Sequence, residues 1–319
     1  LEVRDYQLKS FVHAIRNKRI LLLSPTASGK SLIIYLIIRH LQIENRKGLL
    51  IVPTTSLVEQ MYKDFADYGY DSDQYCHRQY SGKEKHTNKF LTITTWQSIY
   101  KNDKEYFEQF DFVLGDEAHQ FKAKSLTTIL SGCTAAKYRI GTTGTLDGTK
   151  THKLVLEGLF GPSYKVTQTK ELIDKGHLSK LDIKVLLLKH DQHKFNEYEE
   201  EIQYLITHEK RNNFIKNLVL DLNGNSLVLF NRVESHGQPL YELINNSASK
   251  DRKVFFVYGG VNTDTREEIR EIVENEKDAI IVASYGTFST GVNIKRLDNI
   301  IFASPSKSKI RNLQSIGRV

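Results

Sequence analysis

Short apolar runs alternate with longer amphipathic stretches along almost the whole chain, and this alternation restricts the fold more than any other feature. The runs are apolar at nearly every position, which is typical of strands that are buried on both faces of a parallel sheet. Parallel neighbours need a long crossover, usually a helix, and such crossovers are right-handed. The sequence therefore predicts an α/β fold in which mainly parallel sheets are flanked by helices.

The predicted strands form two groups. They are Ile20–Ser24, Leu49–Pro53, Leu91–Thr95, Phe112–Gly115 and Arg139–Thr142, then Leu227–Asn231, Val254–Tyr258, Ala279–Ser284 and Asn299–Ala303. The predicted helices are about Gln7–Asn17, Ser31–Glu44, Thr55–Tyr68, Lys124–Ser131, Glu197–Asp221, Gln238–Asn246, Asp264–Glu274 and Ser308–Ser315. Residues 149–180 are polar with no clear strand, and an apolar run, Ile183–Leu188, follows them. At roughly 150 residues per domain, we expect two domains, residues 1–178 and residues 179–319.

Composition excludes several classes of protein. With 39% hydrophobic and 26% charged residues the chain is too apolar to be disordered. The only two cysteines, Cys76 and Cys133, are far apart, which excludes a cysteine-based zinc site and favours a reducing compartment. No apolar run approaches the roughly 20 residues that span a bilayer, so we expect a cytoplasmic protein. The chain starts at Leu1 without Met, and we expect it to be the middle of a longer polypeptide.

A phosphate-binding loop is predicted after the first strand. The strand runs directly into Pro25-Thr26-Ala27-Ser28-Gly29-Lys30-Ser31, and an apolar helix follows. In such a loop the backbone N–H groups bind phosphate oxygens, Lys30 reaches the β- and γ-phosphates, and the Ser31 hydroxyl ligates Mg²⁺. Ser24 stands where the usual pattern has its first glycine. The alternative is an ordinary tight turn that contains Gly-Lys-Ser by chance.

A pair of carboxylates follows the strand Phe112–Gly115, at the end of the strand where open α/β sheets bind ligands. Asp116 is suited to hold Mg²⁺ through water, and Glu117 to orient and deprotonate an attacking water. A charged loop after a strand is the alternative, which the phosphate loop upstream disfavours. Together the two patterns predict hydrolysis of a nucleotide with Mg²⁺ as a cofactor.

Segments in the rest of the chain resemble the motor core of superfamily 2 helicases and translocases. In chain order they are Arg4-Asp5-Tyr6-Gln7, Val52–Leu57, Thr94–Ser98, Asp116–His119, Thr143-Gly144-Thr145, Leu227–Arg232, Ala283–Val292 and Gln314–Arg318. The runs Val-Pro-Thr-Thr, Thr-Trp-Gln and Gln-x-Ile-Gly-Arg-Val are similar to the UvsW-type recombination helicases of tailed phages. The chain departs from the superfamily pattern at Gly144, where alanine is usual.

The resemblance implies two tandem RecA-like domains with ATP bound between them. It implies that Arg4 and Gln7 contact adenine, and that Gln314 and Arg318 reach the γ-phosphate from the second domain. It assigns the coupling of hydrolysis to nucleic-acid movement to His119, Thr143 and Thr145. It also implies a nucleic-acid face made of Thr54, Thr55, Thr95, Gln97, Arg232, Thr287 and Thr290. Such groups suit phosphates, so binding would be independent of base sequence.

The implied function is an ATP-dependent DNA helicase or translocase that unwinds or branch-migrates branched DNA in recombination, repair and replication. The net charge of +7 favours a polyanionic partner. We expect a monomer in the host cytoplasm, with a single-strand-binding protein as a further candidate partner. Two alternatives stay open: an RNA helicase, because Asp-Glu-Ala-His is shared with RNA helicases, and a nucleotide-gated clamp without processive movement.

Three other features are ambiguous in the sequence. Trp96, the only tryptophan, is suited either to stacking on a base or to packing in the core, and core packing is favoured. His190 and His193 flank Asp191 as in some metal sites, but no further ligand is near, which favours surface residues. For the coupling residues His119, Thr143 and Thr145, the alternative interpretation is ordinary polar packing under the sheet.

Overall fold

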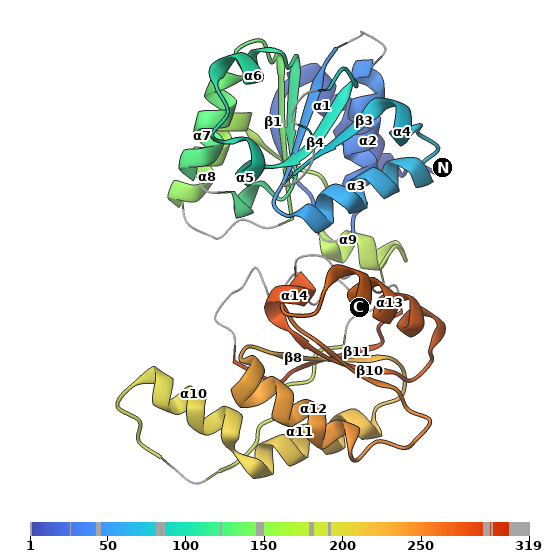
Figure 1. The fold of residues 1–319 in the computed structure, drawn as a ribbon, viewed down its shortest axis with the longest axis vertical. Helices are drawn as coiled ribbons and strands as arrows, with labels where there is room; N and C mark the ends of the chain where they lie inside the picture. The colour runs from blue at the N-terminus through green and yellow to red at the C-terminus, as the bar shows by residue number, and fades with distance from the viewer. Residues whose placement is uncertain are drawn as a thin grey trace. The chain divides into compact units, whose positions relative to one another are not determined.

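The computed structural model describes residues 2–25, 27–42, 46–80, 84, 87–121, 123–144, 150–178, 182–190, 193–289, 294 and 296–305. The chain divides into two compact units, Leu1–Leu178 and Ser179–Val319, each with its own sheet (Figure 1). Every strand pair in both sheets is parallel, and helices flank the sheets. The prediction of two α/β domains with mainly parallel sheets is therefore confirmed. Within these described residues, no helix is both long and apolar enough to cross a membrane.

The first unit contains a seven-stranded sheet with the strand order β3-β4-β2-β5-β6-β1-β7. The strands are β1 Arg19–Leu23, β2 Gly48–Val52, β3 Cys76–Gln79, β4 Leu91–Thr95, β5 Phe112–Gly115, β6 Tyr138–Thr143 and β7 Ser163–Lys165. In register, Val52 lies opposite Thr95 and Leu23 lies opposite Thr143. Because all the strands are parallel, the loops that follow them meet along one edge of the sheet.

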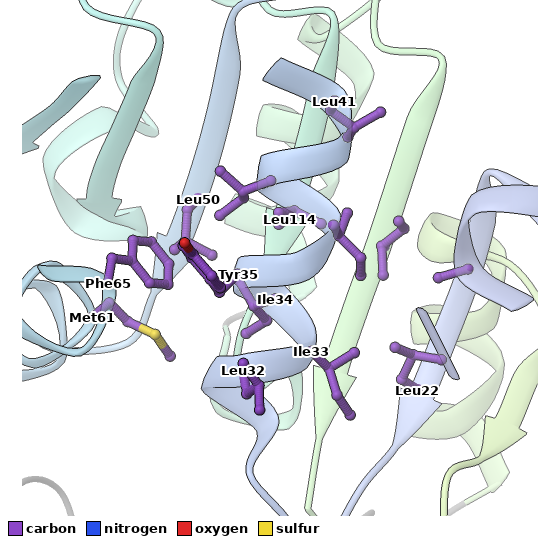
Figure 2. Close-up of a cluster of buried hydrophobic side chains, with 14 of the residues drawn as sticks. Leu22, Leu32, Ile33, Ile34, Tyr35, Leu41, Leu50, Met61, Phe65 and Leu114 are labelled. Carbon is purple, nitrogen blue, oxygen red and sulfur yellow. The ribbon is translucent and has the colours of Figure 1, made fainter. Parts of the chain in front are cut away.

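Two helical layers cover the faces of this sheet. They comprise α1 Asp5–Asn17, α2 Lys30–Gln42, α3 Thr55–Asp67 and α4 Ser72–Tyr75, then α5 Trp96–Ile99, α6 Lys104–Glu108, α7 Ala123–Gly132 and α8 Lys150–Phe160; α9 Thr169–Asp174 follows. Successive residues of β2 belong to different cores. Leu50 packs under α2 with Tyr35 (Figure 2). Leu49 belongs to the core that includes residues of α7. Burial on both faces explains why the central strands β1, β2 and β5 are apolar at nearly every position.

The second unit contains a four-stranded sheet with the strand order β11-β8-β10-β9. Its strands are β8 Ser226–Phe230, β9 Val254–Val257, β10 Ile280–Ser284 and β11 Asn299–Phe302. Its helices are α10 Tyr198–Thr207, α11 Glu209–Asp221, α12 Gln238–Asn245, α13 Thr263–Asn275 and α14 Tyr285–Ser289, with a π-helical turn at Val233–Gly237. One core packs α11 and α12 on β8, and a second packs α13 on the same sheet.

The structure corrects the sequence analysis at several elements. Strands β3 and β7 were not predicted, and β7 lies in the stretch that showed no clear strand. Both are outermost strands with polar sequences, so they lack the apolar run of a central strand. The single helix predicted over Glu197–Asp221 is two helices, because His208 leaves the helical region at φ −67° and ψ 108° and caps α11. Residues 182–190 have no regular structure, and the predicted helix Ser308–Ser315 lies outside the described residues.

Two glycines form a slot beneath the carboxyl edge of the first sheet. Gly115 of β5 and Gly141 of β6 are opposite in register, and the ring of Phe160 from α8 fills the space that their missing side chains leave. A Cβ atom on Gly115 would lie 2.9 Å from the ring, and one on Gly141 would lie 2.8 Å from it. The slot fixes the distance between α8 and the strand that carries the two acidic residues.

Replacing Phe160 with alanine should lower the free energy of unfolding of the first unit by about 3–5 kcal/mol. Removing the fully buried ring leaves a cavity against Gly115 and Gly141, which have no side chains to fill it. Urea unfolding measures the change. The matched control is Leu154→Ala on the same helix, where the side chain is 66% exposed and the change should stay within about 0.5 kcal/mol. Equal losses in both variants would contradict this packing.

Candidate active site

The loop between β1 and α2 is a tight turn held by its own serines. The Ser28 hydroxyl donates to the Pro25 carbonyl at 2.6 Å, so the Ser24 hydroxyl, also 2.6 Å away, is the donor to Ser28. Ala27 and Gly29 have left-handed backbones, with φ of 61° and 76°. Ser24 thus replaces the usual glycine with a side chain that closes the loop from within.

Helix α1 supports this loop from the other side. The Tyr6 hydroxyl and the Gln7 amide Nε2 both donate to the Ser28 carbonyl, at 2.8 and 3.1 Å, and Gln7 Oε1 accepts from the Arg4 backbone N–H at 2.9 Å. A Cβ atom on Gly29 would lie 2.4 Å from Gln7 Nε2, so only glycine permits this approach. Gln7 is buried, and its role toward adenine stays a prediction. Sequence reasoning missed Tyr6, which lies inside the quoted motif but carried no signal of its own.

An ion pair joins the phosphate loop to the acidic turn. Lys30, the first residue of α2, pairs with Glu117, and their side chains are only 12% and 16% exposed. Asp116 is buried at the end of β5, where its Oδ1 accepts from the Thr142 hydroxyl of β6 at 2.5 Å. Glu117 has a left-handed backbone, φ 48° and ψ 45°, and precedes the short 3₁₀ turn Ala118–Gln120. The structure therefore brings the predicted lysine and both predicted carboxylates into one site.

The pKa values of the two neighbouring carboxyl groups are shifted in opposite directions. Burial raises the pKa of Asp116, and Glu117 beside it adds to this, although Lys30 and Thr142 oppose it. Burial also acts to raise the pKa of Glu117, but the charge and hydrogen bond of Lys30, with help from His119, outweigh it and lower the pKa. Ionisation is consequently favoured at Glu117 and disfavoured at Asp116.

The donor set suits a magnesium ion. Ser31 offers a hydroxyl and Asp116 offers a buried carboxyl group. Such hard oxygen ligands are those that Mg²⁺ prefers, and Mg²⁺ commonly takes one or two carboxylates together with nucleotide phosphates and water. Across the described part of the chain, no cluster of three or more His, Cys, Asp or Glu side chains could hold a metal by itself.

His119 connects the acidic turn with β6. Its Nδ1 lies 2.7 Å from the Thr143 hydroxyl and 3.4 Å from Glu117 Oε2, and its side chain is 4% exposed. These contacts bring three predicted residues together from the ends of two adjacent strands. Thr26 and Thr145, also predicted for this site, lie outside the described residues.

The predicted nucleic-acid residues of the first unit lie after β2 and β4, which are adjacent strands. Thr54 caps α3 by accepting from the Leu57 N–H at 3.3 Å, and Gln97 donates to the Pro53 carbonyl at 3.3 Å. Thr55 and Gln97 are exposed, whereas Thr95 is buried with its hydroxyl 2.8 Å from Ser98 Oγ. Trp96 is half-buried against the core beside Tyr100, as the packing alternative predicts.

The second unit repeats this arrangement after β8 and β10. Arg232 pairs with Glu199 of α10 and donates to Gln203 Oε1 at 3.2 Å. Thr287 is buried, with its hydroxyl 2.8 Å from Ser284 Oγ. Thr290, Gln314 and Arg318 lie outside the described residues. His190 and His193 lie beside Tyr204 on the exposed part of the unit.

A polar junction that the sequence did not reveal closes the same edge of the second sheet. Ser304, just after β11, accepts from the Asn231 N–H at 3.1 Å and lies 2.8 Å from His236 Nδ1, while its carbonyl accepts from the Tyr285 hydroxyl at 2.9 Å. His236 is fully buried, and burial together with Arg211 lowers its pKa to about 4. No local motif announces this junction, because its members come from four separate segments.

Known proteins match this chain over both units. Residues 1–148 match the family described as the res subunit of type III restriction enzymes, and residues 209–319 match the helicase conserved C-terminal domain. The ATP-dependent DNA helicase uvsW of Enterobacteria phage T4 is 37% identical over 334 residues, covering 100% of this chain and 65% of the relative. The two family matches indicate a superfamily 2 helicase. The resemblance seen in the sequence is thereby confirmed.

Two other proteins are also similar to this chain. The DNA 3'-5' translocase XPB2 of Sulfurisphaera tokodaii is 26% identical over 186 residues, covering 58% of this chain and 40% of the relative. The crystal structure of the DUF1998 helicase MrfA bound to DNA has a TM-score of 0.70 and 17% identity, covering 99% of this chain and 47% of MrfA. At that identity the likeness concerns the fold alone. This chain spans less than two thirds of the length of the uvsW helicase.

Acid should destabilise the second unit through His236. Its folded pKa, about 4, lies below the unfolded value of about 6.5, so the unfolded state binds the proton first. The stabilisation is complete above about pH 6.5 and is lost as the pH falls toward 4. We expect this group to remove about 2 kcal/mol of unfolding free energy between pH 7.5 and 5.

Urea unfolding of the wild type and of His236→Gln at both pH values measures this contribution, because the other histidines are common to the two proteins. The wild type should lose more stability than the variant on acidification. Identical losses would show that His236 titrates normally in the folded state.

Proposed function

We propose that this chain is the motor core of an ATP-dependent DNA helicase or translocase that unwinds or branch-migrates branched DNA. The observation that carries the proposal is the meeting of Lys30, Glu117, His119 and Thr143 at the carboxyl edge of the first sheet. These residues provide a phosphate-binding cation, a carboxylate base and a connection to the next strand. The relationship to a phage DNA helicase supports DNA as the substrate class.

In this proposal ATP changes the partner of Lys30. The β- and γ-phosphates attract the Lys30 ammonium, which now neutralises Glu117. Glu117 then loses the charge that lowers its pKa, and its carboxylate becomes a stronger base toward the attacking water. Ser31 and Asp116 would hold Mg²⁺, which neutralises charge on the phosphates. Gln314 and Arg318 complete the site from the second unit, where an arginine finger contributes about 10³–10⁵ in rate.

The coupling part of the proposal assigns a relay to His119. When Glu117 accepts a proton from water, a negative charge 3.4 Å from the His119 ring disappears. The hydrogen bond between His119 and Thr143 then changes in strength, and Thr143 ends β6 at the loop leading to Thr145. Proton transfer at one strand end thus alters the conformation of its neighbour.

DNA is proposed to follow the loops after β2 and β4 in the first unit and after β8 and β10 in the second. Thr54, Thr55 and Gln97 offer hydroxyl, amide and backbone N–H groups, which position phosphates without reading bases. Arg232 exchanges Glu199 for a phosphate, at small cost because the pair is solvent-exposed. Thr95, Thr287 and Thr290 belong to the same face. The proposal includes a monomer in the infected host's cytoplasm, with a single-strand-binding protein as a partner.

The first experiment measures ATPase activity with single-stranded, duplex and four-way-junction DNA, and with RNA of the same sequence. Branched DNA should stimulate turnover most strongly, and added salt should weaken the stimulation because the contacts are to phosphates. Stimulation by RNA alone would replace the proposal with an RNA helicase. Nucleic-acid binding that depends on ATP without any turnover would replace it with a clamp.

Glu117→Gln removes the proposed base and retains the shape of the side chain. Turnover of ATP should fall by about 10²–10⁴, the usual contribution of a general base, while binding of ATP and DNA persists. Glu105→Gln is the matched control, since Glu105 is an exposed residue of α6 outside the site, and its activity should equal that of the wild type. Persistent turnover in Glu117→Gln would assign the base to another residue.

A further inference from the structure

The hydroxyl group of Ser31 has a partner that the proposed mechanism does not use. Ser31 Oγ, in the first turn of α2, lies 2.8 Å from Tyr68 Oη, although 37 positions separate the two residues. Both side chains are half-buried. The contact therefore joins the proposed magnesium ligand to the end of α3, which belongs to a different strand–helix unit of the sheet.

The backbone holds Tyr68 in a defined place. Helix α3 ends in a glycine cap: Gly69 is left-handed at φ 84°, its N–H donates to the Ala66 carbonyl at 2.9 Å, and the Tyr70 N–H donates to the Phe65 carbonyl at 3.0 Å. This pair of hydrogen bonds is the Schellman pattern, in which only glycine takes the left-handed position without strain. Tyr68 is the residue immediately before that glycine, so the cap sets the direction of its side chain.

The ring of Tyr68 is also held by α2 itself. Tyr35 follows Ser31 by four positions and lies on the same side of the helix. Its ring is 5.2 Å from the Tyr68 ring, and its hydroxyl donates to the Tyr68 carbonyl at 3.4 Å. Figure 2 shows Tyr35 pointing from α2 toward Phe65 of α3, and the two rings are 5.8 Å apart. Tyr68 is thus docked on α2 through contacts that do not depend on the Ser31 hydroxyl.

A serine hydroxyl that binds a cation needs a hydrogen-bond acceptor for its proton. The hydroxyl has one proton and two lone pairs, and the cation takes a lone pair. The proton must then point away from the cation toward an acceptor, or it faces the positive charge. Tyr68 Oη, 2.8 Å from Ser31 Oγ, is within reach to accept that proton. Groups that orient metal ligands in this way affect the affinity for the metal although they never touch it.

We propose that Tyr68 is a positioning residue for the divalent cation of the bound nucleotide. It accepts the hydroxyl proton of Ser31 and so directs a Ser31 lone pair toward the cation. The inference rests on the proposed function, since it requires Ser31 to bind the Mg²⁺ that accompanies ATP. It adds a residue from α3 to a site otherwise built from the loops after β1 and β5.

The test compares Tyr68→Phe with the wild type in binding a fluorescent, non-hydrolysable ATP analogue, first in EDTA and then over a Mg²⁺ titration. Affinity in EDTA should be unchanged, because the ring and the phosphate loop are retained. The Mg²⁺ concentration that gives half of the cation-dependent tightening should rise about 10-fold, the lower end of the effect of such outer partners. Tyr75→Phe is the matched control, because Tyr75 stacks on Tyr70 in the same aromatic group. Its Mg²⁺ dependence should equal that of the wild type.

Ser31→Ala separates failure of this inference from failure of the proposed function. If Tyr68 acts through Ser31, Ser31→Ala and the double variant with Tyr68→Phe should show the same weakened Mg²⁺ dependence. Unchanged or tighter Mg²⁺ dependence in Tyr68→Phe, with weakened dependence in Ser31→Ala, overturns the role of Tyr68 and leaves the proposed function intact. Unchanged dependence in Ser31→Ala, or no nucleotide binding by the wild type, overturns both.

Discussion

The largely buried ion pair between Lys30 and Glu117 is the interaction on which the candidate site depends. It joins the helix after β1 to the turn after β5, so it ties two strand ends of one parallel sheet. Removing two charges from water is expensive, and their attraction repays this cost only in part. In the proposed mechanism a triphosphate offers Lys30 a stronger partner, so the ion pair would break when the nucleotide binds. The pKa of Glu117 follows the position of Lys30.

Polar side chains near the carboxyl ends of the strands form hydrogen bonds that stabilise the local backbone. Thr95 ends β4 and Thr287 lies just after β10, and each hydroxyl lies 2.8 Å from a serine hydroxyl three positions away. These hydrogen bonds shape the turn at the carboxyl end of each strand. Under the proposed function, hydroxyl and backbone N–H groups near these turns would contact phosphates, which are the same in every sequence.

The sequence was sufficient to predict the site residues that lie close after a recognisable strand. Lys30, Asp116 and Glu117 each follow a strand that is apolar throughout, so their position at one edge of a parallel sheet could be deduced without coordinates. Tyr68 and Ser304 could not be found in this way, because each acts through a partner more than thirty residues away. The outer strands were missed for the opposite reason, since solvent on one side removes the continuous apolar run that identifies a buried strand.

Strain is concentrated where the site is built. Among the described residues, Lys18, Ala27 and Glu117 are the non-glycine residues with positive φ, and two of these three belong to the phosphate loop and the acidic turn. Such a backbone costs of order 1–3 kcal/mol and persists only where surrounding contacts hold it. The Ser24–Ser28 bond and the α1 contacts hold Ala27. The Lys30 pair and the Gly115 slot filled by Phe160 hold Glu117. Contacts with the regular core thus keep two loops of the candidate site in left-handed conformations.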